Sequence, residues 1–311
     1  MNITPSNNST LIGYNEIFLN LKKLYVNAQL PNKIIFSGNS GIGKSTFAYH
    51  FANYIFSKNE DSKYDLKENS ISKKNRSYNL ILNNSHPNFF LVSNDDDKKN
   101  IQISKIREMI NFTNKSSFNG DYKIILIDNV EHLNINSINA LLKVIEEPND
   151  KIFFFLIHNS KTKIVDTLKS RCIKFNLYLS NEDRLIIIDK LTNSQFYNHL
   201  CNDFKNNYNS PGDIILLYNF FKNNKIEDDI SIDDFLKLII EKKLYKKDLY
   251  IKDKISFFVE LYFNKKLIHF ESKDKIYNLY KYFLSRIYEC NVYNLDIENI
   301  LIELNGKLLN G

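Results

Sequence analysis

The stretch GNSGIGKST, from Gly38 to Thr46, decides the fold. It begins with the pattern G-x-x-x-x-G-K-[ST], in which glycines allow backbone N–H groups to turn inward around phosphate oxygens. In this pattern Lys44 reaches the β- and γ-phosphates, and Ser45 offers its hydroxyl to Mg²⁺. The stretch therefore predicts a site for ATP and Mg²⁺, made by Gly38, Asn39, Ser40, Gly41, Ile42, Gly43, Lys44, Ser45 and Thr46.

The sequence on either side of this loop has the context that a phosphate loop needs. KIIFSG, residues 33–38, is a short apolar strand, and KSTFAYHFANYIF, residues 44–56, has helical period. Strand, glycine-rich turn and helix form one half of a βαβ unit. The helix begins at the loop, so its positive N-terminal end faces the anion. A chance match in a loop rich in Gly, Lys and Ser would lack these neighbours.

Further apolar strands alternate with helices up to about residue 176. Strands are predicted at 88–93, 123–128 and 152–157, and helices near 11–30, 103–114 and 135–147, the last closed by Pro148. Strands that are apolar on both faces and alternate with helices predict a parallel sheet covered on both sides. Residues 57–86 are rich in Lys, Asn and Ser and predict a mobile surface insertion.

An acidic residue, Asp128, ends the predicted strand 123–128. After a phosphate loop, such an acid is expected to assist Mg²⁺, although a plain strand end has the same appearance. Many ATPases place a glutamate next, where this chain has Asn129. Glu131 follows two residues later; in an extended chain it would lie about 6.6 Å farther along, too far to contact the attacking water. A sharp bend would bring it back, so its role stays open.

Two polar residues farther along are also candidates. Asn159 follows the strand 152–157, where it would sense the γ-phosphate or orient water, or simply form a strand-end turn with its neighbours. Arg171 lies in the stretch KSRC at the edge of the predicted α/β region. There it either faces a phosphate that belongs to a neighbouring subunit or is a solvated surface residue.

The composition excludes several classes of protein. The chain has 311 residues, 43% hydrophobic and 25% charged, which is typical of a globular protein of about two domains. A net charge of +6 is compatible with a nucleic-acid partner, but because the excess is spread over a long chain it favours a solvated basic surface. The three cysteines are far apart and form no CxxC pair, so neither a zinc knuckle nor a disulfide framework is expected. The longest apolar run, 152–157, is too short to span a membrane, and a cytoplasmic location is expected.

The character of the chain changes after Lys174. The remainder has helical period nearly to its end, with a turn at NSPGD, residues 209–213. We predict three domains: an α/β phosphate-loop domain at 1–176, a small helical domain at 177–228, and a longer all-helical domain at 229–311.

Together these motifs resemble the AAA+ clamp-loader family, and within it the delta-prime subunits of bacterial DNA polymerase III. The matching stretches follow the family's order between residues 11 and 175. They are LIGYNE, GNSGIGKST, HPNFF, ISKIREM, IDNVEHLN, NALLKVIEEP and SRC.

The resemblance implies a fold and a set of partners. The fold would be an AAA+ parallel-sheet domain, followed by a helical lid and an all-α collar. The partners would be motor and delta-type subunits of a hetero-oligomer, a sliding clamp and, through the complex, primed DNA. Arg171 would complete the ATP site of the adjacent motor subunit in trans, and the chain itself would bind ATP with little hydrolysis.

The chain departs from the family pattern in three places. Many relatives carry a four-cysteine zinc module between the phosphate loop and HP, but this chain has no cysteine there, so zinc is not expected. Many delta-prime proteins have a degraded phosphate loop, whereas this loop is intact. The lid arginine expected after SPG is Asp213, which should weaken any response to the γ-phosphate.

Two other interpretations remain open at this stage. The chain would be an ATP-hydrolysing motor subunit if another group replaced the missing glutamate, although Asn129 and Asp213 disfavour this. An unrelated P-loop kinase is the third interpretation, which would leave the SRC stretch unexplained.

Overall fold

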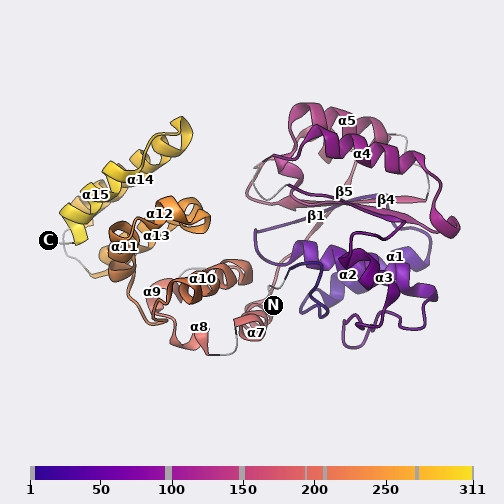
Figure 1. Cartoon of the computed structure of the whole chain (residues 1–311), viewed down its shortest axis with the longest axis horizontal. Coiled ribbons are helices and arrows are strands. Elements are labelled where there is room, and N and C mark those ends of the chain that lie inside the picture. Colours follow the sequence, from indigo (N-terminus) through magenta and orange to yellow (C-terminus); the bar gives the residue numbers. More distant parts are fainter. Residues whose placement is uncertain are drawn as a thin grey trace. The chain divides into compact units, whose positions relative to one another are not determined.

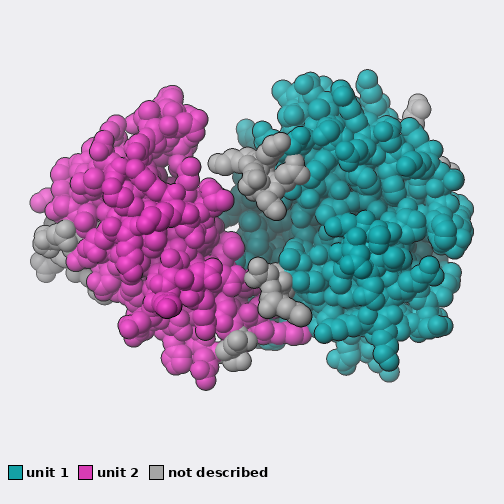
Figure 2. Space-filling model, in the orientation of Figure 1, with its two compact units in different colours: residues 1–187, 210–212 teal, residues 188–209, 213–311 magenta. Residues whose placement is uncertain are grey.

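The computed structural model describes residues 4–94, 100–146, 151–192, 195–205, 209–269 and 273–309. These residues form two compact units, shown in different colours in Figure 2. Unit 1 comprises residues 1–187 and 210–212, and unit 2 comprises residues 188–209 and 213–311. The loop 94–100 and the predicted helix end at Pro148 fall largely outside the described residues.

Unit 1 is built on a five-stranded parallel sheet with the strand order β2-β3-β4-β1-β5. The strands are β1 (Lys33–Gly38), β2 (Phe89–Val92), β3 (Lys123–Ile127), β4 (Ile152–Asn159) and β5 (Ile173–Asn176). The predicted α/β fold with a parallel sheet is therefore confirmed. Because all strands run in one direction, the residues that follow β1, β3 and β4 meet at a single edge of the sheet.

Helices cover both faces of this sheet, as Figure 1 shows. On one face lie α1 (Asn15–Val26), α2 (Lys44–Phe56) and α3 (Arg76–Leu82), and on the other lie α4 (Ile103–Asn114) and α5 (Ile135–Glu146). Shorter elements complete the unit: η1 (Ser57–Asn59), η2 (Phe118–Gly120), η3 (Val130–His132), α6 (Asp166–Lys169) and most of α7 (Asn181–Thr192).

The strand side chains alternate between two hydrophobic cores. In β4, Phe153 and Phe155 pack with α1 and α2, whereas Phe154 and Leu156 pack with α4 and α5. Successive side chains of a strand point to opposite faces, so a strand covered on both sides must be apolar throughout. Each fully buried Phe or Leu stabilises the fold by roughly 1.5–3 kcal/mol, which explains the uninterrupted apolar runs.

The prediction of a mobile surface insertion at residues 57–86 was wrong. This segment contains η1 and α3 and packs into the core on the α1–α2 face. Tyr64 stacks on Phe18 with ring centroids 5.1 Å apart, and its hydroxyl lies 3.0 Å from Nδ1 of His50. The segment has few apolar residues, but several are large, and Tyr64, Ile71, Tyr78 and Ile81 are all buried.

Unit 2 is helical throughout the part of it that the structure describes. Its elements are the end of α7, α8 (Phe196–His199), α9 (Asn202–Lys205), α10 (Pro211–Asn224), α11 (Ile232–Glu241), α12 (Leu244–Lys247), α13 (Leu249–His269), α14 (Lys273–Tyr293), α15 (Glu298–Leu304) and a π-helical turn, Asn305–Leu309. This agrees with the predicted helical C-terminal region. No helix among the described residues is both long and apolar enough to cross a membrane.

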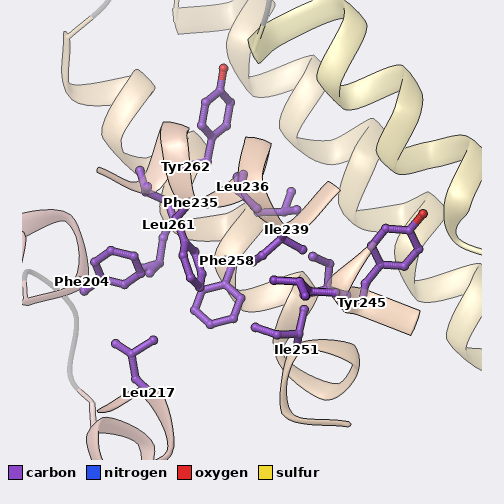
Figure 3. Close-up of a cluster of buried hydrophobic side chains, with 14 of the residues drawn as sticks. Phe204, Leu217, Phe235, Leu236, Ile239, Tyr245, Ile251, Phe258, Leu261 and Tyr262 are labelled. Carbon is purple, nitrogen blue, oxygen red and sulfur yellow. The ribbon is translucent and has the colours of Figure 1, made fainter. Parts of the chain in front are cut away.

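One hydrophobic core joins the helices of unit 2, part of which is seen in Figure 3. Phe204 and Phe221 contact Phe235 with ring centroids 5.4 Å apart in both pairs, and Phe258 lies 5.0 Å from Phe235. Residues on both sides of the predicted domain boundary at 228/229 thus share this core. The division of the helical region into two domains stays a prediction.

Candidate nucleotide-binding site

The loop between β1 and α2 has a backbone that only glycine fits at three positions. Gly41 and Gly43 have positive φ angles of 74° and 90°, which residues with a Cβ rarely adopt. A Cβ on Gly38 would lie 2.4 Å from the carbonyl oxygen of Leu177, and one on Gly41 would lie 2.2 Å from Oγ of Ser210. The sequence pattern and the observed turn therefore agree.

Lys44 is the first residue of α2 and is held by its own loop. Its Nζ donates hydrogen bonds to the carbonyl oxygens of Gly38 (3.0 Å) and Asn39 (2.7 Å), and the residue is only 7% exposed. Burial lowers the pKa of Lys44, whereas the charges of Glu131 and Asp128 act in the opposite direction. A phosphate would replace the two carbonyl oxygens as the partner of this cation, a charge-assisted exchange that favours binding.

Ser45 and Asp128 come together from different elements, α2 and the end of β3. The Ser45 hydroxyl donates to Oδ1 of Asp128 at 2.9 Å. Burial raises the pKa of Asp128, while the bond from Ser45 and the charge of Lys44 lower it. Mg²⁺ prefers hard oxygen ligands and is often held by one or two protein oxygens together with substrate phosphates. The pair fits the predicted metal role, which stays a prediction.

No group of three or more His, Cys, Asp or Glu side chains suited to a metal ion occurs in the described ranges of the chain. The expectation that zinc is not bound also stays a prediction.

The chain turns sharply after Asp128, which is the bent alternative that the sequence left open. Asn129 has the left-handed backbone angles φ 59° and ψ 66°, and η3 follows directly. Asn tolerates this conformation better than most residues with a side chain. The turn carries Glu131 to the end of β4, where its two carboxylate oxygens accept from the backbone N–H of Asn159 at 3.2 and 3.3 Å.

The side chain of Asn159 forms a strand-end turn. Its Oδ1 accepts from the N–H of Lys161 at 3.2 Å, and its carbonyl oxygen accepts from the Thr162 hydroxyl at 2.7 Å. The next residue, Ser160, donates from its N–H to the carbonyl oxygen of Gly38 and from its hydroxyl to Oδ1 of Asn39, both at 3.0 Å. The end of β4 is thus tied to the phosphate loop, and a sensing role for Asn159 stays a prediction.

Arg171 lies at the edge of the sheet opposite to the phosphate loop. It follows α6 and precedes β5, so it is near the amino ends of the strands. Its Nη2 forms an ion pair with Oε1 of Glu146 at 2.7 Å, and Nη1 donates to the carbonyl oxygen of Thr167 at 2.9 Å. The side chain is 37% exposed. The structure therefore does not bring Arg171 to the phosphate loop of its own chain.

Asp213, at the position of the expected lid arginine, has a partner within unit 2. Its Oδ1 accepts from Nζ of Lys254 at 2.7 Å, which ties α10 to α13. The residue before it, Gly212, belongs to unit 1, and its N–H donates to the carbonyl oxygen of Gly41 at 2.9 Å.

Sequence reasoning missed several residues that support the loop. The Tyr14 hydroxyl donates to the carbonyl oxygen of Ile42 at 2.7 Å, and Oγ of Ser37 lies 3.0 Å from Nδ1 of the buried His158. Ser37 and His158 face each other in the register of β1 and β4. Polar residues inside otherwise apolar strands were the available signal, but only the register shows that they pair.

The parallel sheet and its glycine-rich loop place the chain in the P-loop class of proteins. A family model described as "DNA polymerase III, delta subunit" matches residues 13–180, which is more than half of the chain. The chain belongs to this family of clamp-loader proteins, as the motif resemblance predicted.

Curated relatives agree with this assignment. The chain is 27% identical over 147 residues to a DNA polymerase III subunit delta' of Pseudomonas aeruginosa, a match to 47% of this chain and 43% of that protein. It is 30% identical over 152 residues to the subunit delta' of Buchnera aphidicola subsp. Baizongia pistaciae, covering 47% and 44%. The match thus spans less than half the length of either relative.

Among solved structures, a DNA polymerase III gamma subunit-related protein from Thermotoga maritima is similar with a TM-score of 0.48 and 17% identity, over 91% of this chain and 96% of that one.

Proposed function

We propose that this chain is a delta-prime-like subunit of a clamp loader, which helps to place a sliding clamp on primed DNA during replication. Its partners would be the motor and delta-type subunits of a cytoplasmic hetero-oligomer, the clamp and, through the complex, the DNA. Family membership supports the class of machine. The position of Arg171 is the observation that supports the specific, delta-prime-like role.

The sheet geometry supports a role for Arg171 in trans. In the register of the sheet Ile173 pairs with Ile34, and Gly38 lies four residues farther along β1, or about 13 Å at ~3.3 Å per residue. Arg171 precedes Ile173 and therefore lies still farther from the loop. A guanidinium that is exposed and remote from its own nucleotide site suits delivery to a neighbouring subunit, where it would stabilise charge on the γ-phosphoryl oxygens.

The phosphate loop supports nucleotide binding by the chain itself. Lys44 would bind the β- and γ-phosphates, and Ser45 and Asp128 would hold Mg²⁺, which neutralises phosphate charge when bound. The carboxyl edge of the sheet lacks a glutamate directly after Asp128. We therefore expect slow hydrolysis by the isolated chain.

The helical unit supports assembly. One face of α14 exposes Tyr288 (68%) and Val292 (50%), which are four residues apart and therefore neighbours on the helix surface. Exposed apolar side chains that lie next to each other can form part of a protein interface. In the proposed role this face contacts other loader subunits in the collar.

An ATP-hydrolysing motor subunit is the second candidate function, and the position of Glu131 beside Asn159 is the observation that favours it. The third interpretation, an unrelated P-loop kinase, was wrong, because the chain belongs to the DNA polymerase III family.

The test compares ATPase rates of the full chain alone and after reconstitution with motor and delta-type subunits, clamp and primed DNA. The proposed role predicts slow turnover alone, and fast clamp loading only by complexes that contain this chain. Fast turnover by the isolated chain would favour the motor subunit. Complexes that load clamps equally well without the chain would contradict both candidates.

A further inference from the structure

The left-handed turn at Asn129 brings the carboxylate of Glu131 to a position that cannot be read from its spacing in the sequence. Because the chain turns after Asp128, the carboxylate of Glu131 contacts the end of β4, which extends three residues beyond the last residue of β3 in the register of the sheet. β4 is the strand between β3 and β1. The carboxylate of Glu131 therefore lies at the end of the strand between β3, which Asp128 follows, and β1, which the phosphate loop follows.

The sheet register fixes how close this carboxylate is to the loop. Asn159 pairs directly with Gly38, and neighbouring strands lie about 4.8 Å apart. The oxygens of Glu131 are within 3.3 Å of the Asn159 nitrogen. They thus lie within about 8 Å of the first loop residue, a span that a γ-phosphate and one water molecule can fill, since each contact needs about 3 Å.

The electrostatics of the site agree with this placement. Burial has the largest effect on the pKa of Lys44 and lowers it. The charges of Glu131 and Asp128 both raise this pKa, and the effect of Glu131 is the larger of the two. The charge of Glu131 also acts to raise the pKa of Asp128 and that of His158. The carboxylate is therefore part of the same charge cluster as the residues expected to hold phosphate and Mg²⁺.

We propose that Glu131 is the general base for ATP hydrolysis in this chain, in place of the glutamate missing at position 129. Glu131 accepts a proton from a water molecule whose oxygen forms a bond to the γ-phosphorus. The bond from that phosphorus to the β–γ bridging oxygen breaks, and ADP leaves with the electron pair. The products are ADP and inorganic phosphate, and the proton passes from Glu131 to solvent.

The hydrogen bond from Asn159 explains why this base would act slowly. The N–H of Asn159 restrains the carboxylate and competes with water for its lone pairs. A hydrogen bond to a charged group is stronger than one between neutral groups, and turning Glu131 toward the water weakens that bond. The proposal rests on nucleotide binding as proposed above and agrees with slow turnover by the isolated chain.

The experiment uses four full-length proteins: the parent, Glu131→Gln, Lys44→Ala as the background, and Glu108→Gln as a control for the loss of an exposed carboxylate on α4. Single-turnover ATP hydrolysis and calorimetric affinities for ATP and ADP are measured for each. Gln is isosteric with Glu, and its carbonyl oxygen can still accept from Asn159. The fold is therefore expected to survive, and thermal melting checks this.

We expect Glu131→Gln to lower hydrolysis by roughly 10²–10⁴-fold, or to the Lys44→Ala background if that is reached first. ATP affinity should stay within about threefold of the parent or become tighter relative to ADP, because a negative charge near the γ-phosphate is removed. Glu108→Gln should match the parent in every measurement. Glu131→Asp, which keeps the charge but shortens the side chain, should also hydrolyse ATP more slowly than the parent.

Three results would overturn the proposal. They are a parent rate equal to the Lys44→Ala background, an unchanged rate in Glu131→Gln, and loss of ATP binding or of folding in both Glu131 variants. An unchanged or faster rate together with tighter ATP binding would mean that the carboxylate only occupies the phosphate space. If the parent binds no ATP, nucleotide binding in the proposed function fails as well; if it binds ATP and Glu131→Gln changes nothing, only this inference fails.

Discussion

The two edges of the sheet in unit 1 present their basic residues in opposite ways. At the carboxyl edge Lys44 is 7% exposed and bonded to two carbonyl oxygens of its own loop. At the amino edge Arg171 is 37% exposed and bonded to one carboxylate and one carbonyl oxygen. Exposed ion pairs contribute roughly 0–1 kcal/mol, so Arg171 can exchange its partner at little cost. The contrast separates a buried cation that is held within its own loop from an exposed cation that another surface can reach.

The strongest test of this contrast is Arg171→Ala in the reconstituted complex. If Arg171 acts in trans, the clamp- and DNA-stimulated ATPase should fall by up to about 10³–10⁵-fold. ATP binding by the isolated chain should be unchanged. Arg171→Lys should restore little activity, because an ammonium lacks the planar fork of the guanidinium. Arg107→Ala, which removes an exposed arginine on α4, is the control, and a parent-like rate in Arg171→Ala would refute the role.

At the opposite edge, Lys44→Ala should weaken ATP binding by the isolated chain by roughly 10–100-fold, as expected when a charge-assisted hydrogen bond worth roughly 1.5–3 kcal/mol is lost. Calorimetry with ATP and Mg²⁺ measures this directly. Lys23→Ala, at an exposed position of α1, should bind as the parent does. Equal affinities in Lys44→Ala and the parent would contradict the assignment of the loop.

A smaller effect is expected at the turn beside the loop. Asn129→Glu places a poorly suited side chain in a left-handed conformation and should lower the free energy of unfolding by about 1–2 kcal/mol, without a gain in hydrolysis. Asn129→Gly, which fits the same turn, should melt within a few degrees of the parent. A more active and equally stable Asn129→Glu would show that the turn rearranges to admit a base directly after Asp128.

The smallest effect should come from Glu146→Gln, which removes the partner of Arg171. Because both side chains are substantially exposed, the free energy of unfolding should change by less than about 1 kcal/mol. Stimulated ATPase in the complex should stay within a few fold of the parent. A loss as large as that of Arg171→Ala would show that Glu146 positions the arginine and does not merely accompany it.

The sequence predicted the parts of unit 1 that depend on local pattern. The apolar strands at 33–38, 123–128 and 152–157 were sufficient to predict the sheet, and the motif at Gly38–Ser45 was sufficient to predict the glycine-rich turn after β1. The position of Glu131 was not predictable, because it depends on one pair of backbone angles at Asn129. The Arg171–Glu146 pair depends on how α5 and α6 pack, which spacing along the chain does not determine.

The helical unit shows the same limit on a larger scale. Periodicity identifies its helices but does not say which of them share a core. The contact of Phe204 with Phe258 joins α9 to α13, which are separated by three helices in the chain, and this pairing follows from packing alone. Residues 57–86 show the converse. The composition of this segment is polar on average, but a few large apolar side chains pack it against the core.

The alternation of β4 between two cores has a consequence for the kinds of mutation the chain can survive. A point substitution in this strand damages one face, whereas loss or gain of a single residue would reverse both faces beyond it and move Asn159 out of line with Gly38. We therefore expect natural variation in β4 to proceed by exchange of side chains and almost never by change of length. In a deletion library β4 should be depleted more completely than its tolerance of substitution would suggest.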